Sequence, residues 1–276
     1  MRNLLLLTFL WAASSGYTQP LTVGTFNIRY DNPRDSGNLW KDRAAVCASL
    51  IMFHQFDIVG TQEGLKHQLE QLQNMLPEYQ YFGVGRDDGQ SAGEHSAIFI
   101  RKDRFEKLEG GDFWLSTTPE KPGKSWDAAL SRICTWVKLK DKQTKKTFYV
   151  FNAHYDHVGV QARIESSKLI LSRFTDVAGK NPVIVMGDLN GNHDSQWYRT
   201  FQESGLVKDA LWLSPIIYRN NGSFNAFKAA GITQDVIDHI FITPGFSVER
   251  YGILTDTYFG KFPSDHFPVL VTLRFQ

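Results

Sequence analysis

A strand–helix–strand pattern occurs twice in this chain of 276 residues. In the first copy, Leu21–Asn27 has the β-branched and apolar composition of a strand, and Arg43–Gln55 is expected to form a helix. Asp57–Gly60 is expected to be a second strand, which leads to the acidic side chain of Glu63. This first unit therefore presents an amide and a carboxylate near the ends of its two strands.

The second copy has the same order of elements. Thr147–Asn152 is expected to be a strand, Ala162–Phe174 a helix, and the next apolar run a strand that ends at Asp188. In each copy, 36 residues separate the asparagine that ends the first strand from the acid of the second. Further strands are expected at Ser96–Ile100, Ile133–Leu139, Val236–Ile242 and Val269–Phe275. Strands in both halves, with amphipathic helices outside them, favour an α/β fold of one domain in which two sheets pack face to face and helices cover them.

The strand that ends the second copy carries two polar residues just beyond its apolar run. Val183–Met186 is followed by Gly187, and Asp188 and Asn190 then occupy alternate positions. If the backbone stays extended, both side chains point to the same side of the sheet. They would then project into the crevice where open α/β sheets often bind their ligands. A structural turn is the alternative explanation of this segment taken alone.

Residues 1–19 differ from the rest of the chain. A short basic start, an apolar run of about ten residues and a small-residue exit are typical of a secretory signal peptide. The run is shorter than the roughly 20 apolar residues that a membrane span needs, so no transmembrane anchor is expected. An uncleaved interfacial anchor is the alternative. We expect export to the periplasm or the medium, a mature chain that starts between Gly16 and Pro20, and one catalytic domain over residues 20–276 that is a monomer.

Cysteine content and charge limit the class of protein. Cys47 and Cys134 are the only cysteines, each in an apolar setting, so two separately buried thiols are expected, although export permits a disulfide. No Cys/His spacing of a structural zinc site occurs. Thirty basic residues balance twenty-nine acidic ones, and the basic stretch Lys140–Lys146 has the composition of a solvated hairpin. A nucleic-acid substrate is possible, but this charge balance does not favour it.

Polar side chains that flank apolar strands recur along the whole chain. They are Asn27, Glu63, His154, Asp188, Asn190, Asp238, Asp265 and His266. Carboxylates and amides in such places are costly unless they are paired or bind a cation. Oxygen ligands without a cysteine cluster suit Mg²⁺ or Mn²⁺. A carboxylate left free could activate water, a histidine could titrate near neutrality, and the amides could hold phosphate oxygens, so metal-assisted phosphoester hydrolysis is the reaction class that uses every part.

Six short motifs resemble those of the endonuclease/exonuclease/phosphatase superfamily, in the family's order. They are Thr25–Arg29, Gly60–Glu63, Asn152–His154, Gly187–Asn190, Ile237–Phe241 and Ser264–Pro268. The resemblance runs from about Leu21 to the C-terminus. It implies a four-layer α/β/β/α sandwich, with two mixed sheets and outer helices, and one divalent-metal site.

The resemblance also implies a role for each matched residue. Glu63 would be the principal metal ligand, with Asn27 and Asp265 close to the ion. Asp188 would orient or activate the attacking water, and Asn190 would hold a phosphate oxygen.

Three histidines complete the implied site. His266, held by Asp238, would contact the phosphate and stabilise negative charge, and His154 would lie near the leaving group or a phosphate oxygen. Arg132 and His157 would be additional phosphate contacts. The alternative for Arg132 is a structural ion pair, with Asp156 in the same role.

Substrate identity is less constrained by these motifs. Trp114, Trp126 and Phe224 could line a sugar or base site, or could be part of the core. In the Gly222–Phe227 loop, Asn225 stands where a histidine or similar residue is expected for the branch of secreted bacterial members. An exported Mg²⁺- or Mn²⁺-dependent hydrolase of a small or medium phosphoester is the function expected first. A secreted nuclease and a non-catalytic binding protein on the same scaffold are the alternatives.

Overall fold

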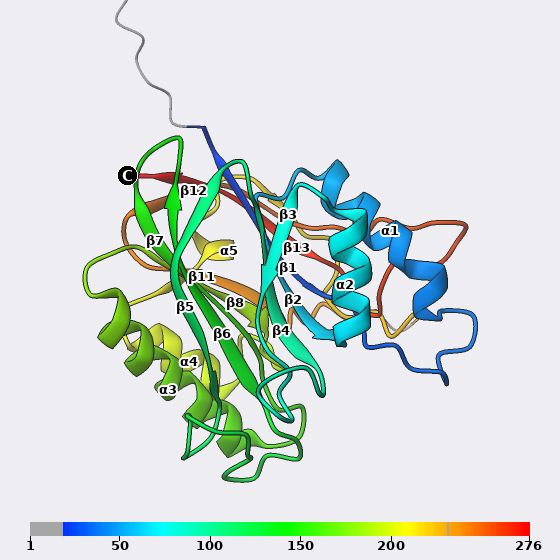
Figure 1. Ribbon diagram of the computed structural model, residues 1–276, viewed down its shortest axis with the longest axis horizontal. Helices are drawn as coiled ribbons and strands as arrows, with labels where there is room; N and C mark the ends of the chain where they lie inside the picture. Colours follow the sequence, from blue (N-terminus) through cyan, green and yellow to red (C-terminus); the bar gives the residue numbers. More distant parts are fainter. Residues whose placement is uncertain (1–18, 231) are drawn as a thin grey trace, which may run out of the picture.

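The computed structural model describes residues 19–230 and 232–276 (Figure 1). The predicted signal peptide, except for its last residue, lies outside these ranges. The elements are β1 (Leu21–Asn27), α1 (Trp40–Phe53), β2 (Ile58–Gly64), α2 (Lys66–Met75), β3 (Tyr79–Phe82), β4 (His95–Arg101), β5 (Phe105–Trp114), β6 (Ile133–Asp141), β7 (Thr147–His154), α3 (Val160–Ala178), β8 (Val183–Asp188), α4 (Gln196–Glu203), β9 (Lys208–Asp209), α5 (Ala210–Leu213), β10 (Ile217–Tyr218), β11 (Asp238–Ile242), β12 (Phe246–Ile253) and β13 (Val269–Phe275). Within the described ranges, no helix combines the length and apolar character needed to span a bilayer.

The strands form two mixed sheets. One has the order β10-β12-β13-β1-β2-β4-β3 and the other the order β5-β6-β7-β8-β11-β9. The two expected strand–helix–strand units are confirmed: β1 pairs in parallel with β2 across α1, and β7 pairs in parallel with β8 across α3. Parallel pairing places the carboxyl ends of both strands at the same edge of a sheet, so Asn27 lies opposite Gln62 and His154 lies opposite Asp188.

Helices cover the outer face of each sheet, which gives the expected α/β/β/α order of layers (Figure 1). Strand alternation explains this layering. In β8, Ile184 and Met186 contact the core between the two sheets, whereas Val183 and Val185 contact the core under α3 and α4. A third core lies between α1, α2 and the other sheet. Burial of both faces is why these central strands are apolar at nearly every position until they reach the edge.

The two cysteines and the basic stretch behave as expected. Cys47 and Cys134 are free, buried, and belong to different cores, so they are two separate thiols. The basic stretch turns between β6 and β7, where Lys140 pairs with Thr147 in an antiparallel hairpin. The strand expected at Val236–Ile242 begins two residues later, at Asp238.

Candidate active site

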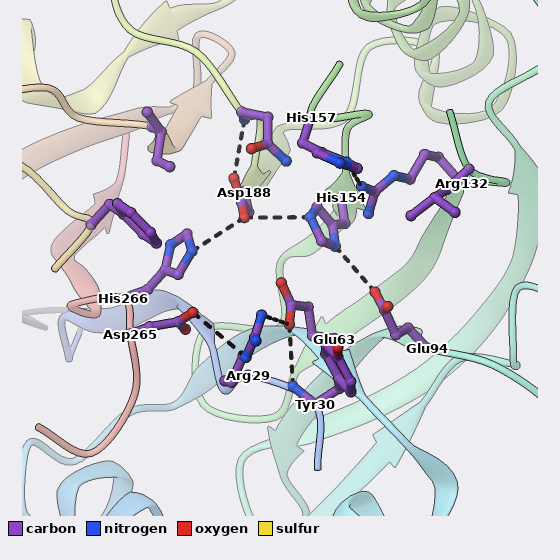
Figure 2. A pocket seen from close by; sticks show the side chains of 14 residues that line it. Arg29, Tyr30, Glu63, Glu94, Arg132, His154, His157, Asp188, Asp265 and His266 are labelled. Carbon is purple, nitrogen blue, oxygen red and sulfur yellow. Dashed lines mark hydrogen bonds and ion pairs between the residues drawn. The ribbon is translucent and has the colours of Figure 1, made fainter. Parts of the chain in front are cut away.

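Side chains from distant segments meet at one end of the two sheets, in a pocket of about 470 Å³ (Figure 2). The pocket is lined by Arg29, Tyr30, Glu63, Glu94, Leu130, Arg132, His154, His157, Asp188, Asn190, Phe224, Ile237, Asp265 and His266. Eight of the ten residues expected from the sequence are in this lining. The other two, Asn27 and Asp238, are buried directly beneath it, where each contacts a lining residue.

Glu63 reaches the pocket because of a backbone irregularity at the end of β2. The register between β2 and β4 shifts between Thr61 and Gly64, and Glu63 has a φ of 65°. This left-handed conformation costs a non-glycine residue roughly 1–2 kcal/mol. Two donors hold the side chain in return: the backbone N–H of Tyr30 lies 3.2 Å from Oε2, and Nδ2 of Asn27 lies 3.1 Å from Oε1. The strained backbone and these two hydrogen bonds together aim the carboxylate.

Asp188 and Asn190 do not share an extended backbone. β8 ends at Asp188, and Asn190 has a φ of 48°, so the turn given as the alternative follows the strand in place of an extended backbone. The backbone N–H of Asn190 donates to Oδ1 of Asp188 at 3.0 Å, and its side-chain amide donates to the carbonyl of Tyr155. Aspartate favours such a local turn because its carboxylate accepts from the backbone two residues later. Both side chains still line the pocket, through a turn.

Asn27 connects the carboxylates of the two sheets. Its Nδ2 donates to Glu63 and, at 2.9 Å, to Oδ2 of Asp188, while its Oδ1 accepts from the backbone N–H of Arg29. All of its amide atoms are thus used within the protein. Asn27 supports the pocket from below, and its expected place close to a metal ion stays a prediction.

His266 and Asp238 form a buried pair. Nδ1 of His266 lies 2.9 Å from Oδ2 of Asp238, and its Nε2 lies 3.7 Å from Oδ2 of Asp188. Burial opposes a charge on the ring, but the two carboxylates outweigh it and raise the pKa of His266 well above its ordinary value. The ring is therefore a cation at neutral pH, directed toward the pocket.

Burial also affects two other acids in the pocket, Asp188 and Asp265. Burial raises the pKa of Asp188 to about 7, although His266 opposes this shift, and burial also raises the pKa of Asp265. One ligand atom each from Glu63, His154 and Asp188 lies within 4.8 Å of the others. Hard oxygen donors in this arrangement fit a divalent cation such as Mg²⁺, which would favour the ionised carboxylates.

Arg29 faces two of the expected metal ligands (Figure 2). Its guanidinium lies 3.7 Å from Glu63 and 3.7 Å from Asp265, and Asp35 holds it through two hydrogen bonds. Glu63 and Asp265 thus face the same guanidinium from the two sides that Figure 2 shows. The structure therefore brings these two acids to the same wall of the pocket.

Arg132 lies in the pocket and also close to Asp156, so both the phosphate contact and the structural ion pair considered from the sequence are compatible with its position. Its Nε lies 3.6 Å from Asp156, and its Nη2 lies 3.1 Å from Nδ1 of His157. The side chain is buried, yet its Nε and Nη1 have no hydrogen-bond partner among the described residues. Arg132 is therefore a buried cation in the pocket lining whose N–H groups are not all taken up by protein acceptors.

His154 lies between Asp188 and Glu94 (Figure 2). Its Nε2 is 3.4 Å from Asp188 and its Nδ1 is 3.7 Å from Glu94. Burial, reinforced by Arg132 and Arg86, lowers the pKa of His154 well below its ordinary value, so the ring is neutral. Burial also raises the pKa of Glu94 to about 7, although a bidentate pair with Arg86 opposes that shift.

Several lining residues were not expected from the sequence. Arg29 and Ile237 lie within two of the motifs that carry the family resemblance, so position in a motif was a usable signal for both. No pattern distinguished Tyr30, Glu94 or Leu130. Their place in the pocket depends on loop geometry.

Of the three aromatic candidates, only Phe224 lines the pocket, where its ring contacts His266 at a centroid distance of 5.0 Å. Trp114 is core and donates to the carbonyl of Arg86. Trp126 lies on another part of the surface. Asn225 is buried and donates to the carbonyl of Ser264, so it fastens its loop to the segment before Asp265.

Comparison with known proteins agrees with this geometry. The profile of the Endonuclease/Exonuclease/phosphatase family matches residues 24–266. An uncharacterised protein of Acanthamoeba polyphaga mimivirus is 27% identical over 264 residues, which cover 84% of this chain and 91% of that protein.

Solved structures resemble the chain over nearly its whole length. An endonuclease/exonuclease/phosphatase family protein from Bacteroides thetaiotaomicron has a TM-score of 0.91 and 46% identity, covering 94% of this chain and 99% of its own. A mannosyl-6-phosphatase from Bacteroides thetaiotaomicron has a TM-score of 0.90 and 46% identity, covering 92% of this chain and 100% of its own.

Proposed function

This chain belongs to the endonuclease/exonuclease/phosphatase family, and we propose that it is a divalent-metal-dependent hydrolase of phosphomonoesters, with a sugar phosphate as the substrate class. One observation carries the proposal. The carboxylates of Glu63, Asp188 and Asp265 share one pocket with the cationic His266 and with the unused N–H groups of Arg132. Acids on one side and anion donors on the other suit a metal-bound phosphate.

The residues for a cation are Glu63 and Asp265, with Asp188 and His154 close by. When bound, Mg²⁺ or Mn²⁺ would polarise a phosphoryl oxygen and neutralise part of its charge. The protein supplies the rest of the chemistry. Oδ2 of Asp188 holds or accepts the proton of the attacking water, and the His266 cation stabilises the negative charge that develops on the phosphoryl oxygens.

Preference for a monoester follows from the number of anion-binding groups. A phosphomonoester has three non-bridging oxygens and up to two negative charges, whereas a diester has two such oxygens and one charge. Asn190, Arg132 and His266 all line the pocket and carry N–H donors. The proposal is supported by the name of the 46% identical Bacteroides thetaiotaomicron protein, a mannosyl-6-phosphatase. Tyr30 and Phe224 are placed to contact the organic part of the substrate.

A substrate panel tests the proposal. Purified chain 20–276 is given mannose 6-phosphate, glucose 6-phosphate, a nucleoside monophosphate, bis-p-nitrophenyl phosphate, RNA and plasmid DNA, each with Mg²⁺, with Mn²⁺ and with chelator. We expect phosphate release to be fastest from a hexose phosphate, absent in chelator and restored by metal. Faster cleavage of the diester or of nucleic acid would overturn the monoester preference, and activity that survives chelation would overturn the metal requirement.

Export is part of the same proposal. It is supported by the basic, apolar and small-residue order of residues 1–19. Expression of the full chain followed by mass spectrometry of the exported protein is expected to give a new N-terminus between Gly16 and Pro20. Protein that stays in the cytoplasm with Met1 or Arg2 at its N-terminus would contradict export.

A further inference from the structure

A second cluster of metal-binding residue types lies outside the catalytic pocket. His193 is in the loop after β8, Asp209 ends β9, and His239 is in β11. Oδ2 of Asp209 lies 3.6 Å from Nε2 of His193 and 3.2 Å from Nδ1 of His239, and one ligand atom of each residue lies within 4.8 Å of the other two. Over the described residues, the lining of the catalytic pocket includes none of the three.

The hydrogen bonds of this cluster leave the lone pair on Nδ1 of His239 without a donor. Nε2 of His239 lies 3.0 Å from the carbonyl of Gly191, and a ring nitrogen makes that bond only as an N–H donor. In the neutral ring, Nδ1 then turns a lone pair toward the carboxylate of Asp209, and two lone pairs repel. A cation between them, or a second proton on the ring, is needed. Nε2 of His193 is also buried and has no hydrogen-bond partner within the described part of the chain.

We propose that His193, Asp209 and His239 bind a transition-metal cation of the Zn²⁺ type. Zinc bonds to nitrogen and carboxylate oxygen are about 2.0–2.1 Å long, so donors of a tetrahedral ion lie about 3.3 Å apart and two bound imidazoles have centroids about 5 Å apart. The two measured donor separations are 3.2 and 3.6 Å, and the centroids of the two imidazoles are 5.1 Å apart with an interplanar angle of 80°.

Neighbouring backbone groups orient two of the three proposed ligands, as is usual around bound metals. The carbonyl of Gly191 fixes the tautomer of His239, and the backbone N–H of Leu211 donates to Oδ1 of Asp209, so Oδ2 stays directed at the cluster. The hydroxyl of Tyr198 also donates to Oδ2 of Asp209, at 3.2 Å. Imidazole donors select Zn²⁺ over Mg²⁺, so this cluster and the oxygen-rich catalytic pocket would take different ions.

The metal would fasten the loop that carries a catalytic side chain. Asn190 lines the catalytic pocket, Gly191 accepts from His239, and His193 would be a ligand. A bound ion would thereby connect this loop to β9 and β11. We expect metal at the cluster to slow the motion of the loop.

Cobalt is the probe that tests the site, because four-coordinate Co²⁺ absorbs visible light and replaces Zn²⁺. The chain is studied in a Glu63→Ala background with excess Mg²⁺, so that the catalytic pocket does not contribute. We expect one equivalent of Co²⁺ to bind with a four-coordinate spectrum. His193→Ala abolishes this spectrum, whereas His193→Cys keeps it and adds a thiolate-to-cobalt band. His67→Ala, which removes an exposed histidine, behaves as the parent.

Two results would overturn the site. One is the absence of a four-coordinate Co²⁺ spectrum in the parent, with the His239 ring doubly protonated by NMR, which would make the cluster a buried ion pair. The other is an equal Co²⁺ stoichiometry in His193→Ala and His67→Ala. Folding is monitored by circular dichroism. If His193→Ala does not fold, Asp209→Asn and the thiolate band of His193→Cys decide the question, because that band requires a metal bound at position 193.

Discussion

Nδ2 of Asn27 donates a 2.9 Å hydrogen bond to Oδ2 of Asp188, although 161 positions and two different sheets separate the residues. The same amide nitrogen donates to Glu63. One buried side chain thus fixes the distance between a carboxylate of each sheet. The candidate active site is assembled across the interface of the sheets, and its geometry depends on how they pack.

Asn27→Ala is expected to loosen this connection. A hydrogen bond to a charged group contributes about 1.5–3 kcal/mol, so we expect a loss of that order in the free energy of unfolding and at least a tenfold fall in kcat. Urea denaturation and steady-state kinetics measure both. The control is Asn181→Ala. Asn181 lies just before β8, far from the pocket end of that strand, and its side chain donates to the backbone carbonyl of Ala178 at the end of α3. It should lose some stability and keep its kcat; equal kcat values in the two variants would contradict the role of Asn27.

Replacement of Glu63 by glycine and by alanine separates catalysis from backbone strain. Both changes remove the carboxylate, so both are expected to lower turnover by orders of magnitude. Only glycine adopts a φ of 65° without penalty, so Glu63→Gly should be about 1 kcal/mol more stable than Glu63→Ala. Denaturation midpoints in urea compare the two. If Glu63→Ala is as stable as Glu63→Gly, then the backbone at position 63 relaxes in the variants and the left-handed conformation imposes no strain.

Asp238→Asn is expected to change the pH dependence through His266. Asp238 and Asp188 raise the pKa of His266 well above its ordinary 6.5 against the effect of burial. The stabilisation from the protonated ring is therefore complete below about pH 6.5 and is lost as the pH rises through the higher pKa of the folded state. Without Asp238, the His266 ring should lose its proton at lower pH. The alkaline limb of the pH–activity profile should therefore also shift to lower pH.

NMR titration of the His266 ring in metal-free protein measures this shift directly. Asp31→Asn is the matched control, since it removes a carboxylate 3.0 Å from the exposed ring of His67. Its activity profile should coincide with that of the wild type. A His266 ring that titrates identically with and without Asp238 would rule out the pairing as the cause.

Arg132→Lys tests whether the Arg132 guanidinium binds the phosphate of the substrate. Lysine keeps the charge and loses the planar set of N–H donors, so we expect KM for a phosphomonoester to rise about tenfold, and Arg132→Ala to cost more. Folding should survive, because Asp156 also accepts from the backbone N–H groups of Leu130 and Gly159. Arg173→Lys, at an exposed ion pair, is the control and should leave KM unchanged. An unchanged KM in Arg132→Lys would mean that the guanidinium does not contact substrate.

Local pattern was sufficient to predict most of the fold. Runs such as Val183–Met186 are apolar on both faces because each face packs against a different core, and this makes the strand visible in the sequence. The parallel pairings follow from the helix between the strands. The same logic located Glu63, Asp188 and His154, because polar residues that recur at the ends of several apolar strands are costly to bury unless they are paired or bind a cation.

Conformations at those strand ends could not be predicted in the same way. The left-handed backbone of Glu63 depends on a register shift against β4, and the turn at Asn190 replaced an extended segment. Arg29 and Glu94 became pocket residues through contacts with other segments. Such features are set by neighbours that are distant in the sequence, so periodicity carries no signal for them.

The order of strands and helices and the identity of the acids and histidines of the site follow from the sequence. The reason is that apolar patterning acts over a few neighbouring residues, and so does the cost of burying a charge. The tertiary structure alone decided which of these groups meet and in which protonation state. Asn27 meets Asp188, the ring of His266 is a cation, and that of His154 is neutral. The physical reason is that burial and charge–charge interaction depend on distances through space, which exist only after the two sheets have packed.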